Sequence, residues 1–338
     1  IPIFINKQTE ILLILKNIKN LFIFTGALLL IFSNVCADMK TVPASALEPK
    51  TKHIRSSELI THILTSYHYK KTELDDELSA LIYKHYLKNL DQNKAYFLKS
   101  DIDEFDHYKY EIDDALIRSD LNPAFEIFKR YRNRVDERIR FALEMINTDF
   151  DFSIDETYRF DRREDDWLVD KANLDKLWYK RVKNDVLNLK LTKKEPDEIK
   201  QTLIARYNRI LNSTLQLNSN DVFQSFINAY TTSIEPHTAY FSPRTSENFD
   251  IRMRLSLEGI GAVLRGDNDY TEVVKIIKGG PADLSNELKA DDRIVGVAQG
   301  GESKIVDVIG WRLDDVVDLI RGPKGSIIRL EVLPKDIG

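Results

Sequence analysis

The sequence predicts an α+β protein of several domains, in which an all-α N-terminal domain precedes a β-rich domain that contains two helices. A chain of 338 residues exceeds the usual size of a single hydrophobic core. Of its 13 glycines, all but Gly26 lie at or after Gly259. Aromatic residues show the opposite distribution, since only Tyr270 and Trp311 follow Gly259. A long stretch that is rich in aromatic residues and free of glycine is typical of helices.

The first segment, residues 1–37, has the pattern of a secretory signal peptide. Lys16 and Lys19 precede an apolar run at 21–32, and small residues follow up to Ala37. The run is too short to span a bilayer comfortably, so the segment predicts export to the periplasm. The alternative is an uncleaved segment that anchors the chain in the inner membrane. Membrane contact is expected only through this segment or through membrane-associated substrates.

Residues 40–250 are predicted to form the helical domain. Pro196 suits the first turn of a helix, the acidic residues Asp197 and Glu198 suit its dipole, and Asp221 is the expected N-cap of the last helix. We interpret the apolar positions as core and expect no chemistry from this domain. Helical spacing of apolar and aromatic residues occurs at 59–67, 74–86, 125–139, 174–186, 199–211 and 222–227.

Residues 255–334 are predicted to form the β-rich domain. The β-branched runs IGAVLRG, TEVVKIIKGG, DRIVGVAQGG and IIRLEVLP end in turn residues and indicate strands. One helix is expected after Pro281. A second is expected within IGWRLDDVVDLIRG, where Gly322 and Pro323 stop it.

Several classes of function are disfavoured by composition and motifs. A net charge of −5 argues against a nucleic-acid-binding protein. The six histidines form no H-E-x-x-H pair, and Cys36 is the single cysteine, so no metal is expected. The segment GIGAVL places Leu264 where a dinucleotide fold needs its third glycine, so no cofactor is expected either. Ser303 and Lys304 are not assigned a catalytic role.

The glycine loop at the start of the β-rich domain is the candidate binding site. Gly259 and Gly261 flank Ile260, and a strand follows. A loop whose amides point into one pocket can hold the carboxylate of a peptide C-terminus, while the strand after it pairs with the peptide backbone.

The segments GIGAVL, GGPA, DRIVGV and LIRGPKGS, in that order, look like the PDZ domain of the tail-specific, or C-terminal processing, serine proteases. Upstream, LDQNKAYFLKSDIDEF and EPHTAYFSPR resemble the helical domain that precedes this PDZ domain in the long periplasmic members of the family. The resemblance covers essentially the whole chain after the signal segment.

This resemblance implies a set of peptide-binding residues. The carboxylate loop is followed by the strand that receives the peptide, and a helix at 313–320 closes the groove. In such proteases a serine nucleophile and a lysine base lie in a domain after the PDZ domain, so no catalytic residue is assigned within this chain. The implied binding residues are Gly259, Ile260, Gly261, Ala262, Val263, Leu264, Leu313, Val316, Val317 and Ile320.

The expected function is therefore that of the N-terminal part of an exported serine endopeptidase, whose PDZ domain captures apolar C-termini of protein substrates. The alternative is a non-catalytic periplasmic PDZ module for peptide binding or scaffolding. Two local features bear on the site. Glu258 would repel an incoming carboxylate, and Arg254 and Arg265 are candidates to offset it. Asp291 and Asp292 replace the family's usual Gly-Asp, which a turn tolerates because Asp adopts left-handed backbone angles.

Overall fold

A computed structural model describes residues 3–6, 41–254, 259–267, 269–323 and 325–335. The chain divides into two compact units: residues 41–247 form one, and residues 1–40 and 248–338 form the other. The α+β fold class is confirmed, with helices in the first unit and an antiparallel sheet in the second. Apart from strand β1, the predicted signal segment lies outside the described residues.

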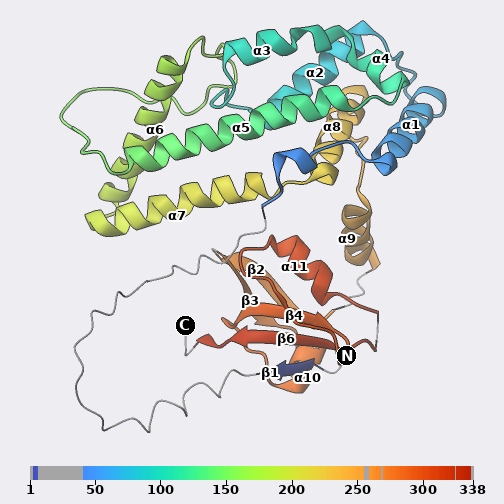
Figure 1. The fold of residues 1–338 in the computed structure, drawn as a ribbon, viewed down its shortest axis with the longest axis vertical. Coiled ribbons are helices and arrows are strands. Elements are labelled where there is room, and N and C mark those ends of the chain that lie inside the picture. Colours follow the sequence, from blue (N-terminus) through green and yellow to red (C-terminus); the bar gives the residue numbers. More distant parts are fainter. Residues whose placement is uncertain (1–2, 7–40, 255–258, 268, 324, 336–338) are drawn as a thin grey trace, which may run out of the picture. The chain divides into compact units, whose positions relative to one another are not determined.

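The first unit, here called the helical unit, consists of helices with two short 3-10 turns at Ala44–Ala46 and Asp106–Tyr110 (Figure 1). The last helix, α9, crosses the boundary between the units. None of the described helices is both long and apolar enough to cross a membrane. The helices are α1 (Thr51–Ser66), α2 (Asp76–Leu90), α3 (Lys99–Phe105), α4 (Ile112–Ile117), α5 (Asn122–Met145), α6 (Lys171–Leu191), α7 (Pro196–Leu215), α8 (Ser219–Ile234) and α9 (Pro243–Arg254).

The helical unit has two hydrophobic clusters that α5 connects. The first packs α2 against α8 around the buried rings of Tyr86 and Phe226, whose centroids lie 5.4 Å apart. The second surrounds Trp178 of α6, which is fully buried and donates a hydrogen bond of 2.6 Å to the carbonyl of Ala95. Since α5 contacts α6, α7 and α8, it supplies side chains to both clusters.

Two sequence-based predictions for this unit were wrong in detail. In α1 the predicted apolar stripe is buried only at Leu64: Leu59 is 59% exposed, and the polar residue His53 shares the buried face with Leu64. Hydrogen bonding by His53 lets a polar residue take an inward position. In α8 the N-cap is Asn218, and Asp221 instead accepts a hydrogen bond from the Asn218 amide across a capping box.

The burial of His53 predicts a pH dependence of stability. Its Nδ1 accepts from the Lys50 amide and its Nε2 donates to Asn220, and burial lowers the pKa of this imidazole. A histidine with a depressed pKa stabilises the fold above its unfolded pKa of about 6.5 and loses that contribution as pH falls. Urea unfolding at pH 7 and pH 5 should show a smaller pH-dependent loss in His53→Gln than in the wild-type chain. An equal loss in both proteins would contradict this assignment.

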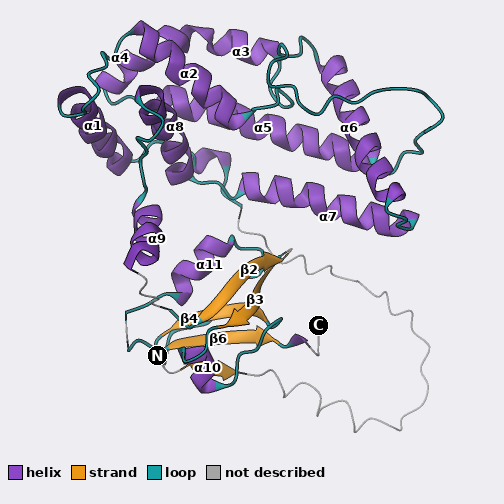
Figure 2. Cartoon of the chain, turned by 180° about the vertical axis from the view of Figure 1, so that it is seen from behind, coloured by secondary structure: helices purple, strands orange, loops and turns teal. Residues whose placement is uncertain are grey.

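The second unit, here called the PDZ unit after the resemblance of its sequence, is built on one sheet in the order β1-β6-β4-β3-β2, with β5 paired to β4. β1 is parallel to β6, and the remaining pairs are antiparallel. Figure 2 shows α11 beside β2, and Figure 1 shows α10 next to β1, which stands at the other end of the sheet order. The elements are β1 (Ile3–Asn6), β2 (Ala262–Asp267), β3 (Tyr270–Ile276), α10 (Pro281–Ser285), β4 (Arg293–Gln299), β5 (Val306–Asp307), α11 (Leu313–Ile320) and β6 (Ile328–Leu333).

Candidate functional site

The loop before β2 is held by its carbonyl groups. The carbonyl of Ile260 accepts a hydrogen bond of 2.8 Å from the amide of Ala282, and the carbonyl of Gly261 accepts one of 2.8 Å from the amide of Ile277. The side chain of Ile260 is buried in the core of the PDZ unit. The predicted loop residue Ile260 can therefore offer a ligand its amide, but its side chain belongs to the core.

Gly261 occupies a position that an L-residue with a side chain does not fit. Its φ of +75° lies in the left-handed region, and a Cβ there would come within 2.9 Å of the Cα of Gly280. Gly259 has a φ of +153° but open space around it. The two predicted loop glycines thus serve different purposes: Gly259 permits an unusual backbone angle, and Gly261 also permits close approach of the Gly280 backbone.

The amides of this loop are its available polar groups. Within the part of the chain that the structure describes, the amides of Gly259, Ile260 and Gly261 donate to no backbone carbonyl. A buried or half-buried amide without an acceptor is costly unless water or a ligand supplies one. Consecutive amides with their carbonyls turned the other way form a concavity that favours an anion.

The strand after the loop has an unpaired edge among the described strands. β2 pairs with β3 and stands at the end of the sheet order, with an irregularity in the register between Val263 and Leu264. Val263 is 45% exposed, whereas Ala262 and Leu264 pack against the core and remain partly accessible. An edge strand presents free amides and carbonyls to which an extended peptide can pair.

The helix predicted at 313–320 is observed as α11 with the same bounds. Leu313 and Val317, one turn apart, are partly exposed. Val316 and Ile320 were predicted to bind peptide, and this needs correction, because both are buried in the core of the PDZ unit. In so short a helix the positions three apart from the groove residues turn toward the sheet, so their side chains are unavailable to a ligand.

Charges near the loop are already compensated in part. Arg265, a candidate to offset Glu258, instead pairs with Glu272 at 3.0 Å, and Glu258 lies outside the described residues. Asp291 has a φ of +69°, as expected for an aspartate in a left-handed turn position, and its carboxylate pairs with Lys335, which lowers its pKa. The Arg265 guanidinium is therefore engaged by Glu272.

The structure brings together the loop, β2 and one face of α11, as the sequence predicts, but it also adds residues that sequence reasoning missed. Ile277, Gly280 and Ala282 hold the loop from the turn between β3 and α10. Their sequence signal was present in the GGPA motif, because a glycine pair before a proline marks a turn with close backbone approach. No cluster of metal-ligating side chains occurs among the described residues.

Two family models match the chain. Residues 60–244 match the tail specific protease N-terminal domain, and residues 249–333 match the PDZ domain. These matches correspond to the helical unit and to the PDZ unit.

Among curated proteins, the tail-specific protease of Haemophilus influenzae is 38% identical over 332 residues, which cover 94% of this chain and 47% of that protein. The carboxy-terminal processing protease CtpA of Bacillus subtilis is 33% identical over 104 residues, covering 31% of this chain and 21% of its own. This chain thus spans about half the length of the first of these relatives. Among solved structures, the PDZ domain of a carboxy-terminal protease from Vibrio cholerae in complex with peptide is 60% identical over 24% of this chain and 85% of that chain, with a TM-score of 0.23.

Proposed function

Because the chain belongs to the tail-specific protease family, we propose that its PDZ unit binds the free C-terminal tails of protein substrates. In this proposal, a part of the whole protein that lies outside this chain cleaves the bound substrate. The relatives are named as proteases, and this chain covers 47% of the length of the first. In this proposal the whole protein is a serine endopeptidase whose serine and lysine lie outside this chain. The signal-peptide pattern of residues 1–37 supports a periplasmic location.

The observation that carries the proposal is the loop with bonded carbonyls and unbonded amides beside an unpaired strand edge. The carbonyls of Ile260 and Gly261 are fixed by Ala282 and Ile277, so the loop amides turn the other way. A tail carboxylate would accept hydrogen bonds from these amides, and the residues before it would add to the edge of β2. The amides are held in place before the tail arrives, which lowers the entropic cost of binding.

The tail is expected to end in apolar residues. Ala262 and Leu264 of β2 and Leu313 and Val317 of α11 are apolar and partly accessible. They offer no charged partner to a tail side chain, so an acidic or basic terminal residue would lose hydration without compensation.

Fluorescence anisotropy with a labelled peptide tests tail binding. A peptide ending in Leu-Ala-Ala with a free carboxylate should bind with a Kd of roughly micromolar strength, as suits a selector that releases its product. The same peptide with a C-terminal amide should bind at least about tenfold more weakly, since hydrogen bonds to a charged group contribute about 1.5–3 kcal/mol. Equal binding of the acid and the amide would exclude capture by the carboxylate.

A charge placed on α11 should block the site without unfolding it. Val317→Glu puts a carboxylate on the partly exposed face of α11 and should weaken binding of the free-acid tail by about tenfold, because an apolar tail residue would face an unpaired charge. Val306→Glu is the matched control, since Val306 lies on β5 at 39% exposure, away from β2 in the sheet order. Equal affinity of these two variants would contradict the groove assignment.

The protease part of the proposal requires the whole protein. The full-length protein should cleave a substrate with an apolar free tail faster than the same substrate with a tail ending in lysine. Val317→Glu in the full-length protein should reduce this preference. Binding of tails by a full-length protein that cleaves neither substrate would favour the non-catalytic alternative.

A further inference from the structure

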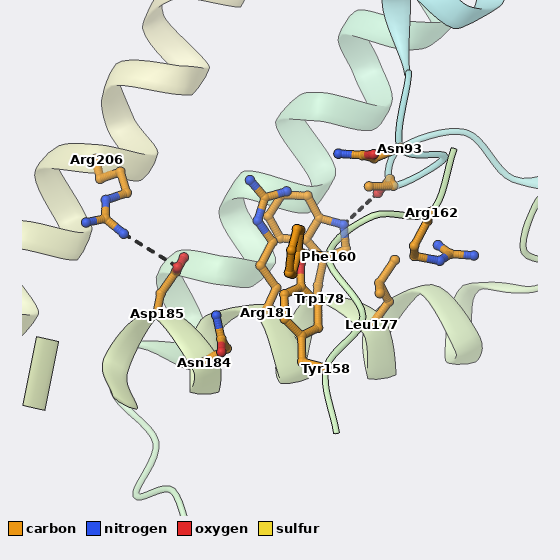
Figure 3. A pocket seen from close by; sticks show the side chains of 11 residues that line it. Asn93, Tyr158, Phe160, Arg162, Leu177, Trp178, Arg181, Asn184, Asp185 and Arg206 are labelled. Carbon is orange, nitrogen blue, oxygen red and sulfur yellow. Dashed lines mark hydrogen bonds and ion pairs between the residues drawn. The ribbon is translucent and has the colours of Figure 1, made fainter. Parts of the chain in front are cut away.

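A cavity of about 360 Å³ in the helical unit is lined by three arginines and by one carboxylate, that of Asp185 (Figure 3). The cavity is formed by the loop after α2, by residues 158–162 and by helices α6 and α7. Its volume is in the range of small-molecule and side-chain binding sites. It lies in the unit from which the sequence predicted no chemistry.

The three arginines of the cavity differ in their partners. Arg162 pairs with Asp165 at 3.0 Å, and Arg206 lies 3.5 Å from Asp185. Arg181 stacks over the ring of Trp178, with its guanidinium carbon 4.4 Å from the ring centroid. It forms no ion pair with any residue in the described ranges.

The Asp185 carboxylate acts electrostatically on Arg181, but the two form no described ion pair. The Tyr207 hydroxyl donates to Asp185 at 2.7 Å, so that carboxylate is already shared by Tyr207 and Arg206. Arg181 also lies over the Trp178 ring and close to the hydroxyls of Tyr96, Tyr158 and Tyr207. An arginine keeps its charge at all ordinary pH values, so the three arginines of the lining outnumber its one carboxylate.

We propose that this cavity, here called the Arg181 pocket, binds a single carboxylate carried by a peptide whose neighbouring residue is apolar. The excess of arginines in the lining favours an anion, and the planar fork of Arg181 can bind both oxygens of a carboxylate. The Asp185 carboxylate in the same wall would repel a doubly charged phosphate. Asn184 adds an amide to the lining, which can donate a hydrogen bond to the ligand.

The apolar part of the ligand is inferred from the walls and from an adjoining hollow. Phe160 lines the cavity and is 76% exposed, so its ring is accessible to a ligand. A second cavity of about 130 Å³ shares Tyr158 and Asn184 with the Arg181 pocket. Its lining combines the apolar side chains of Phe152, Ile154 and Leu187 with Glu156, which pairs with Lys180 and Lys183, so a ligand that leaves the pocket meets apolar side chains beside an ion-paired cluster. A peptide that carries a carboxylate next to an apolar residue fits this arrangement of the two cavities.

Calorimetric titrations on the 338-residue chain that carries Val317→Glu test this proposal separately from tail binding by the PDZ unit. Two acetylated probes carry one carboxylate each: Leu-Phe with a free C-terminus, and Leu-Glu-Phe with a C-terminal amide. The neutral probe is Leu-Phe amide. We expect one or both acids to bind and the neutral probe not to bind. The acid that binds identifies the carboxylate as terminal or as a side chain.

Substitutions within the pocket assign the binding to Arg181. Arg181→Gln should weaken binding of the acid probe that binds the parent chain by about tenfold or more. Arg181→Lys should recover only part of this affinity, because lysine keeps the charge but lacks the planar fork. Lys176→Gln, which removes a positive charge from an exposed position on α6, should bind like the parent chain. Phe160→Ala, at an exposed position where folding is unaffected, should weaken binding about threefold.

Three results would overturn the proposal. The first is that neither acid binds. The second is that the neutral probe binds as tightly as an acid, and the third is that inorganic phosphate binds more tightly than either acid. Unchanged binding in both Arg181→Lys and Phe160→Ala would also overturn it, even if Arg181→Gln failed to fold. Loss of tail binding in the PDZ unit alone would leave these outcomes unaffected, because Arg181 and Val317 lie in different units.

Discussion

Replacement of Gly261 by alanine is expected to abolish tail binding and to destabilise the PDZ unit. Alanine at a φ of +75° is strained, and its Cβ would lie 2.9 Å from the backbone of Gly280. Strain and a backbone contact together should cost about 3 kcal/mol. The loop would shift to relieve the contact, so the free-acid tail should bind at least about tenfold more weakly. Trp311 is the tryptophan of this unit, so its fluorescence during urea unfolding can report the loss of stability.

Gly300→Ala separates backbone strain from the contact with Gly280. Gly300 has a φ of +78°, close to that of Gly261, but no atom lies within 4 Å of the Cβ that alanine would add. This control should cost about 1–2 kcal/mol and leave tail affinity unchanged. If Gly261→Ala binds the tail like the wild-type chain, the loop is not the carboxylate site.

Replacement of Asp101 by asparagine is expected to be the most damaging polar substitution in the helical unit. The Asp101 carboxylate is buried and accepts hydrogen bonds from the Leu98 amide at 2.9 Å, from Arg130 at 2.6 Å and from Arg134 at 2.8 Å. Removing the charge leaves two arginines without their shared partner. The expected loss is about 3 kcal/mol of unfolding free energy, measured by urea denaturation.

A matched control lies on the same helix. Asp103 pairs with Lys99 at 2.6 Å, but both side chains are more than half exposed, so Asp103→Asn should cost only about 0.3 kcal/mol. Similar losses for the two substitutions would show that the Asp101 network contributes no more than a surface pair.

The Asp101 network also sets the acid stability of the helical unit. Burial opposes ionisation, but the hydrogen bonds from Arg134, Leu98 and Arg130 outweigh it and hold the pKa of Asp101 below its usual value. A carboxyl with a depressed pKa stabilises the fold above its unfolded pKa of about 3.9, and the contribution is lost as pH falls through the folded pKa. Asp101→Asn should therefore flatten the pH dependence of stability below about pH 4, and an unchanged profile would contradict this cause.

Sequence patterns predicted the elements that have strong periodicity or clear stop signals. α11 has the predicted bounds because Gly322 and Pro323 follow its apolar residues. The longer strands were predicted from β-branched runs, although the short strands β1 and β5 were missed. α3 and α4 were also missed, since they are short, carry acidic residues and lack a sustained apolar stripe. α9 was missed as well, because its apolar residues at 249, 251 and 253 alternate with polar ones.

The binding site was predicted less completely than the fold. In α11, apolar residues lie on two faces, and their spacing alone does not show which face packs against the sheet. The structure shows that the buried face is the one with Val316 and Ile320. The contact between Gly261 and Gly280 joins two segments that are distant in sequence, so the GGPA motif indicates a close backbone approach but not its partner. The Arg181 pocket is likewise lined by residues from four segments of the chain. Arg181 itself lies within the helix predicted at 174–186, and no local pattern distinguishes it from other charged residues of that helix.

The most direct test of tail capture is an amide chemical-shift titration of the isotope-labelled chain with an apolar peptide. With a free C-terminal carboxylate, the amide resonances of Gly259, Ile260 and Gly261 should shift downfield, because each amide gains a charged acceptor. The amidated peptide should leave these three resonances nearly unchanged. Shifts of equal size with both peptides, or shifts confined to residues outside the loop and β2, would contradict the account of the PDZ unit as a receptor for C-terminal tails.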